Sequence, residues 1–174
     1  MNRGSSTINA YVLAALLAVV ALVQSTIITR IRIFGVSPDL VLLFVVATVL
    51  IGGAHEGLLV SLVGGITTDI LSSAPFGLTT ISLVAVNYLV GLGEINIFRT
   101  VRVWPYTAVL VATLVYNGIF MVLLDITGRD LLWGPTLWRV IAPSLLVNTV
   151  CMPLVYLLVY WLCSHMRPKP AEWE

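Results

Sequence analysis

Charged residues are scarce in this chain. Asp, Glu, Lys and Arg make up 10% of its 174 residues, whereas a soluble domain usually carries about 25%. The nine Lys and Arg nearly balance the eight Asp and Glu, so no excess of charge points to nucleic acid. Hydrophobic residues reach 59%, more than a soluble core of this length can bury. The bilayer is therefore expected to be part of the solvent of this protein.

Histidine and cysteine are nearly absent, with two residues of each. Cys151 and Cys163 lie in an apolar stretch and give neither a disulfide framework nor a zinc site. His55 and His165 are far apart, so neither a Ser/His/Asp set nor a metal-ligand spacing is present. The glycines follow helical spacing and not the order of a phosphate-binding loop. The sequence therefore predicts a protein that is not an enzyme and has no cofactor or metal.

Six apolar segments are predicted to cross the membrane, and shorter ones are tolerated inside a bundle. Their expected limits are 8–29, 37–51, 56–71, 76–92, 103–124 and 138–163. The expected fold class is all-α: a polytopic membrane helix bundle with six transmembrane helices. It forms a single integral membrane domain over 1–174, with short tails at 1–7 and 167–174. The first segment is too long for the core of a signal peptide and is expected to remain as an anchor.

Six spans place both termini on one side of the membrane. That side would hold five Lys and Arg, and the other side four. The basic pairs Arg99 with Arg102 and Arg167 with Lys169 lie on the richer side. By the positive-inside rule we expect both termini to be cytoplasmic.

Small residues recur along one face of the third segment. Gly53, Gly57, Ser61 and Gly65 are spaced four residues apart, and Asp69 ends the row. On a helix this spacing stacks them along one side, where another backbone can approach closely. The pattern predicts a helix-packing groove. Because tight turns flank the segment, we expect neighbouring helices of the same chain to fill it.

Asp69 is a costly residue inside a membrane segment, which makes it a functional candidate. It could carry protons in a channel, but a second buried carboxylate or histidine to complete a relay is missing. The alternative is a structural role, in which Asp69 bonds nearby hydroxyls or Ser72 and Ser73. We favour the structural role, and on sequence alone expect Asp69→Asn to be tolerated.

Amide side chains lie within four different segments, where they could line a solute path. More often such amides bond across helices, at about 1 kcal/mol or less each. The four amides are Gln24, Asn87, Asn117 and Asn148. We interpret them as bonds that hold the helices together.

The start of the second segment carries helix-start residues. Ser37 is expected to be the N-cap, Pro38 the first helical residue, and Asp39 is expected to face the positive end of the helix dipole.

Two positions are candidates for partner docking. A stripe of small residues runs along the first segment at Ala10, Ala14 and Ala18. The links of this segment are looser than those of the third, which leaves it freer to receive another helix. The outer loop 125–137 carries Trp133 in an exposed apolar run, which is typical of a contact surface.

The second to fourth segments resemble the MreD family of rod shape-determining membrane proteins. The matching features, in order, are Pro38-Asp39-Leu40, Gly53, Gly57, Gly65, Asp69 with Ser72-Ser73, and Phe76-Gly77-Leu78. Ser61 stands where an unbroken glycine ladder would have Gly, but it is still small. The resemblance covers about residues 37–93, whereas the last eighty residues resemble the family only in hydropathy.

The resemblance implies a non-enzymatic subunit of the bacterial cell-elongation complex, in the inner membrane. It implies the bitopic protein MreC as a direct partner, with the MreB filament, the RodA glycosyltransferase and a class B penicillin-binding transpeptidase in the same complex. The family is also similar in fold to the six-helix S components of energy-coupling-factor vitamin transporters. A substrate-binding S component is therefore the alternative function. The few polar residues on the outer side favour a scaffold over a vitamin pocket.

Overall fold

The computed structural model describes residues 3–26, 36–95, 104–128, 134 and 137–166. All the secondary-structure elements within these ranges are helices. They are α1 (Arg3–Thr26), α2 (Leu40–Gly52), α3 (Ala54–Leu71), α4 (Leu78–Ile95), α5 (Trp104–Ile126), the π-helical turn η3 (Leu137–Ile141) and α7 (Ala142–Met166). The six α-helices correspond to the six predicted segments, with ends that differ by up to five residues, and α1 starts at Arg3, inside the predicted tail 1–7. The expected all-α bundle is confirmed.

The start of α2 differs from the prediction. Asp39, and not Ser37, is the N-cap, because its carboxylate accepts a hydrogen bond from the Leu42 amide at 3.1 Å. Pro38 therefore precedes the cap and is not the first helical residue. A carboxylate at this position satisfies one of the free N–H groups of the first turn and also favours the helix dipole.

One residue, Gly53, separates α2 from α3. Its φ is +91°, a conformation that L side chains rarely adopt. Its amide donates to the Val49 carbonyl at 2.8 Å, and its own carbonyl accepts from the Gly57 amide at 3.1 Å. One residue thus connects the two helices, although the predicted limits 37–51 and 56–71 left four residues between them, and α3 starts at Ala54 instead of Glu56.

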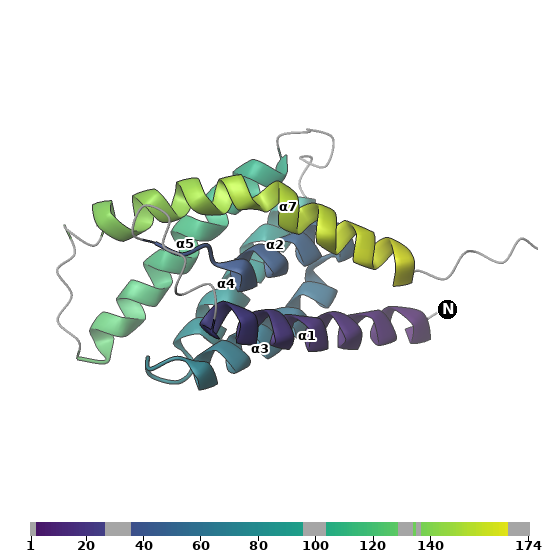
Figure 1. Cartoon of the computed structure of the whole chain (residues 1–174), viewed down its shortest axis with the longest axis horizontal. Helices are drawn as coiled ribbons and strands as arrows, with labels where there is room; N and C mark the ends of the chain where they lie inside the picture. Colours follow the sequence, from purple (N-terminus) through teal and green to yellow (C-terminus); the bar gives the residue numbers. More distant parts are fainter. Residues whose placement is uncertain (1–2, 27–35, 96–103, 129–133, 135–136, 167–174) are drawn as a thin grey trace, which may run out of the picture.

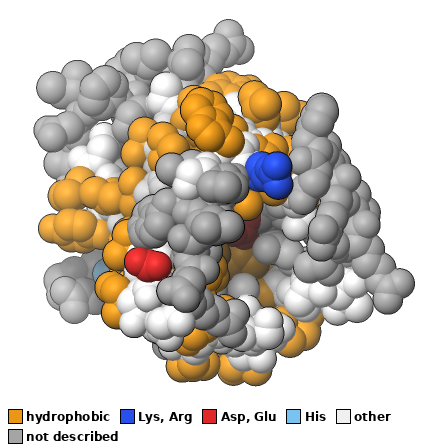
Figure 2. Space-filling model, turned by 90° about the vertical axis from the view of Figure 1, so that its left-hand side faces the viewer, with side chains coloured by type: hydrophobic (Ala, Val, Ile, Leu, Met, Phe, Trp, Pro, Cys, Tyr) orange, Lys and Arg blue, Asp and Glu red, His pale blue; other side chains and the backbone are white. Residues whose placement is uncertain are grey.

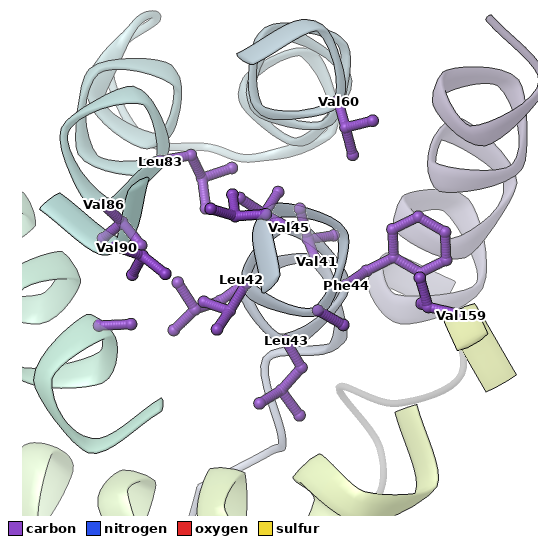
Figure 3. Close-up of a cluster of buried hydrophobic side chains, with 14 of the residues drawn as sticks. Val41, Leu42, Leu43, Phe44, Val45, Val60, Leu83, Val86, Val90 and Val159 are labelled. Carbon is purple, nitrogen blue, oxygen red and sulfur yellow. The ribbon is translucent and has the colours of Figure 1, made fainter. Parts of the chain in front are cut away.

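Helix α2 lies in the centre of the bundle. Its residues from Val41 to Val49 are buried on every side. Figure 3 shows Phe44 on one side of α2 near Val159 of α7, and Leu42 on the other side toward α4. Helices α1, α3, α4, α5 and α7 all contact α2. With 13 residues, α2 is shorter than the roughly 20 residues of a lipid-facing span; the helices around it take the place of lipid.

The remaining helices enclose α2 and run along the bundle. Helix α1 begins and α7 ends at the same end of the bundle, on the right of Figure 1. Among the described residues, two helical stretches are long and apolar enough to cross a membrane, Pro105–Ile126 and Trp138–His165. Shorter apolar stretches lie in α1, α2 and α4. Together they make a membrane helix bundle.

Candidate functional site

Helix α3 packs closely against its neighbours through its small residues. A Cβ at Gly65 would lie 2.5 Å from the Thr80 Cα, a backbone atom of α4. A Cβ at Gly57 would overlap the side chains of Asn87 in α4 and Val49 in α2. Ser61 between them is fully buried, and its hydroxyl bonds the Gly57 carbonyl of its own helix at 2.7 Å. Helices of the same chain therefore occupy this face.

Two glycines differ from the predicted stripe. Gly53 lies before α3 starts, and open space surrounds the position that its Cβ would take. Gly64 was not singled out from the sequence, yet a Cβ there would overlap Leu17 of α1. The close approach of α1 to α3 thus uses a second face, one residue away from the face that meets α4. The available signal in the sequence was the pair of adjacent glycines, Gly64 and Gly65, of which a pattern with a spacing of four residues includes only Gly65.

Asp69 caps the start of the next helix. Its carboxylate accepts hydrogen bonds from the backbone amides of Gly77, Thr79 and Thr80 at 3.0–3.1 Å, and from the Thr80 hydroxyl at 2.6 Å. Only 3% of Asp69 is exposed. One of these donors is a nearby hydroxyl, as expected, but Gly77 and the first turn of α4 supply all four donors, whereas the Thr67 and Thr68 hydroxyls bond carbonyls of α3. The N-terminal amides and dipole of α4 compensate the buried charge.

Asp39 forms the second cluster and is half-buried. Its carboxylate accepts from the Leu42 amide and, at 3.2 Å, from the Gln24 amide group of α1. The side-chain carbonyl of Gln24 accepts a hydrogen bond from the Val41 backbone amide at 3.0 Å. Asn148 of α7 accepts from the Asp39 amide at 3.0 Å and donates to the Thr113 hydroxyl of α5 at 3.3 Å. The start of α2 is thus hydrogen-bonded to α1 and α7, and Asn148 extends the cluster to α5.

Tyr116 of α5 lies near both clusters, close to Asp39 and to Thr79. The Thr79 amide in turn donates to Asp69 at 3.0 Å. Sequence reasoning missed Tyr116, Thr113 and Thr79. Thr113 and Tyr116 lie three residues apart on one face of an apolar helix, and this spacing was the available signal.

The polar network lies at the end of the bundle opposite the start of α1 and the end of α7. Asp39 begins α2 and Asp69 precedes α4, on the left of Figure 1. Figure 2 views that end and shows an acidic side chain recessed behind the surface, with a Lys or Arg side chain at the surface above it.

The four side-chain amides singled out in the sequence differ in their hydrogen-bond partners. Gln24 and Asn148 bond across helices, as predicted. Asn117 donates instead to the Thr113 carbonyl of its own helix at 2.8 Å. Asn87 is 4% exposed, and its side-chain oxygen has no hydrogen-bond partner within the described residues.

The candidate docking residues are only partly described. Ala18 is half-buried, beside Leu17 and Ala21, which face the core. Ala14 lies in α1, but its side chain is outside the described residues, and so is all of Trp133. The exposed side of α1 carries Val19, Leu22 and Val23. Of the family-motif residues, Phe76 is 69% exposed and Gly77 adopts a φ of +97°.

Two hollows on the described surface are apolar. One of about 380 Å³ lies along α5, and a smaller one of about 90 Å³ lies between α4 and α5. Their lining residues are Val115, Gly118, Ile119, Val122 and Leu123 for the first, and Leu89, Val90, Thr107, Ala108 and Val111 for the second. Neither offers the convergent polar groups that a small-molecule site needs.

The fold and the network define an integral membrane helix bundle whose buried polar side chains bind helix to helix. A family model described as rod shape-determining protein MreD matches residues 5–166. The chain belongs to the MreD family, and the match extends over the last helix as well. No curated protein and no solved structure matches the chain. The similarity to S components therefore stays a prediction.

Proposed function

We propose that this protein is a non-enzymatic scaffold subunit of the cell-elongation complex. In this role it binds MreC in the inner membrane and supports the peptidoglycan synthases. Both termini face the cytoplasm, and the network of Asp39 and Asp69 faces outward. The family match makes it a rod shape-determining membrane protein; the partner and the orientation are our inference.

One observation carries the scaffold role. The carboxylates of Asp39 and Asp69 accept hydrogen bonds from donors of the chain itself: backbone amides, the Thr80 hydroxyl and the side chain of Gln24. Hydroxyl groups along the helices also bond their own carbonyls, as Thr48, Thr68 and Ser82 do. Polar groups used in this way stabilise a bundle and leave little to bind a solute.

The first helix is the proposed docking site for the partner's membrane helix. Its inner side is occupied by α3, with Leu17 and Ala21 buried, and its outer side is apolar and exposed. Ala18 lies at the border between the two sides. A second proposed contact is the outer end, where Phe76 is exposed. Trp133, the docking candidate from the sequence, lies outside the described residues.

The test is an affinity purification of the tagged, full-length protein from membranes, read by mass spectrometry. We expect MreC to co-purify, with RodA and the transpeptidase in smaller amounts. Co-purification of a transporter ATPase or a bound vitamin, without MreC, would replace the proposed function by the S-component alternative.

Cysteine cross-linking locates the docking site. Cysteines at Val19 and Leu22 should cross-link to the partner's helix, and Ala18 more weakly. Cysteines at the buried Leu17 and Ala21 are the matched controls and should not react. Cross-links that map only to α5 or α7 would refute the docking site and leave the scaffold role standing.

A further inference from the structure

The first turn of α2 receives its capping hydrogen bonds from three helices. Asp39 itself accepts from the Leu42 amide at 3.1 Å. Asn148 of α7 accepts from the Asp39 amide, and Gln24 of α1 accepts from the Val41 amide, both at 3.0 Å. In a capping box the third helical residue returns a hydrogen bond to the N-cap amide, but here that residue is the apolar Leu42. Side chains from outside α2 therefore complete its cap.

Gln24 is bound through both ends of its side-chain amide. Its carbonyl oxygen accepts from the Val41 amide, and its NH2 group donates to the Asp39 carboxylate at 3.2 Å. An amide suits this place because it carries an acceptor and a donor side by side, whereas a carboxylate only accepts and an apolar side chain does neither. Two adjacent hydrogen bonds to α2 restrict both the rotation and the depth of the helix that carries Gln24.

The rest of the inner side of α1 is apolar. Leu17, Ala21 and Gln24 follow one another at helical spacing and share one side of α1. Leu17 and Ala21 are buried, and a Cβ at Gly64 of α3 would overlap Leu17. Val19 lies on the opposite side and is 56% exposed. Apolar contacts alone resist a rotation of α1 weakly, because lipid replaces those that are lost, whereas hydrogen bonds are directional.

We propose that Gln24 is a positioning residue, which holds α1 at one rotation against the start of α2 and so sets the side that α1 presents to the membrane. Without the two hydrogen bonds, α1 stays in the bundle but turns on α3, and Val19 no longer has a fixed outward direction. The hold on α1 belongs to this chain alone. Its consequence for a partner helix rests on the proposed function.

A pair of cysteines within the chain measures the rotation of α1 without a partner. The inner pair, Leu17→Cys with Gly64→Cys, joins α1 to α3, and the shortening of Leu17 frees the space that the new Cβ needs. The outer pair, Val19→Cys with Gly64→Cys, starts from the exposed side of α1. The free cysteines Cys151 and Cys163 are replaced by Ser. In lipid nanodiscs with an oxidant, we expect the inner pair to form a disulfide and the outer pair to form little.

Gln24→Met removes both hydrogen bonds and keeps an unbranched side chain of similar length, so the variant should fold. Disulfide formation should fall at least about fivefold in the inner pair, the effect of losing one hydrogen bond, and should rise in the outer pair. The matched control is Asn148→Ala, which removes a hydrogen bond to the same helix start from α7 and leaves the contacts of α1 in place. The positioning role is refuted if Gln24→Met leaves the inner pair unchanged, or if Asn148→Ala lowers it equally.

The partner gives a separate readout. Cross-links from cysteines at Val19 and Leu22 to the partner's membrane helix should also fall about fivefold in Gln24→Met. If no such cross-links form in the original protein, the proposed docking site is wrong, and the inner pair still decides the role of Gln24. A weakened inner pair with unchanged partner cross-links would refute the link from Gln24 to the docking side.

Discussion

Helices α2 and α7 are both strongly apolar, yet their surroundings are opposite. In α2 the residues from Val41 to Val49 are buried, and five helices surround them. In α7 the side chains of Leu146, Val150 and Leu154 are 67%, 73% and 74% exposed. Composition alone does not separate the two, because lipid and protein interior are equally good solvents for an apolar side chain. What distinguishes them is length, the caps at their ends and the small residues that pack against them.

The largest expected effect comes from filling the contact between α3 and α4. In Gly65→Leu the new side chain meets the backbone at Thr80, which cannot rotate away. We expect a loss of about 3 kcal/mol or more and little protein in the membrane. Gly118→Leu on α5 is the matched control, because open space surrounds the position of its Cβ. The measurement is membrane accumulation and thermal unfolding in detergent, and equal behaviour of the two variants would refute the close packing.

The second largest loss of stability is expected for Asp69→Asn. On sequence alone we expected this variant to be tolerated, but the structure reverses that expectation. Four donors point at the carboxylate, and an amide would direct its own N–H groups toward some of them. We expect a loss of about 2 kcal/mol, as for hydrogen bonds to a charged group. Asp125→Asn is the control, because Asp125 is exposed at the end of α5 and its change should leave the melting temperature unaltered.

The sequence predicted the helices better than it predicted their contacts. Apolar length and the residues around Asp39 and Ser72 marked the helix ends within a few residues, since those signals are local. The stripe of small residues identified α3 as a packing helix, but not that Gly53 lies outside it or that Gly64 faces α1. Helix faces are decided by which neighbours are present, and spacing alone does not contain that information.

The polar network could be predicted only in part. Asp39, Asp69, Gln24 and Asn148 stand out because polar residues are rare in apolar segments. Their pairing depends on which helix ends meet in space, and so Asp69 was assigned to neighbours in sequence and not to the first turn of α4. Tyr116 escaped notice because tyrosine is common in membrane helices near interfaces.

A smaller effect is expected from the amide that ties α7 to the centre. Asn148→Ala removes the acceptor for the Asp39 amide and the donor to Thr113. We expect a loss of about 1 kcal/mol, typical of hydrogen bonds between membrane helices. Thr113→Val should cost less, and the double variant should cost less than the sum, because one bond is shared. Thermal unfolding of the four proteins measures this, and strict additivity would contradict the bond between Asn148 and Thr113.

The smallest effect on stability is expected on the exposed side of α7. Leu154→Ala should change the free energy of unfolding by less than about 0.5 kcal/mol, because lipid replaces the lost contacts. Leu43→Ala, the same change at a fully buried residue of α2, should cost about 2 kcal/mol or more. This pair tests the contrast between the two helices directly, by thermal unfolding of each variant. A second readout on Leu154→Ala is the yield of co-purified MreC, which should be unchanged if α1 is the docking site. A stable Leu154→Ala protein that no longer retains MreC would instead assign the partner to α7, and the exposed leucines there would be a protein interface and not a lipid-facing surface.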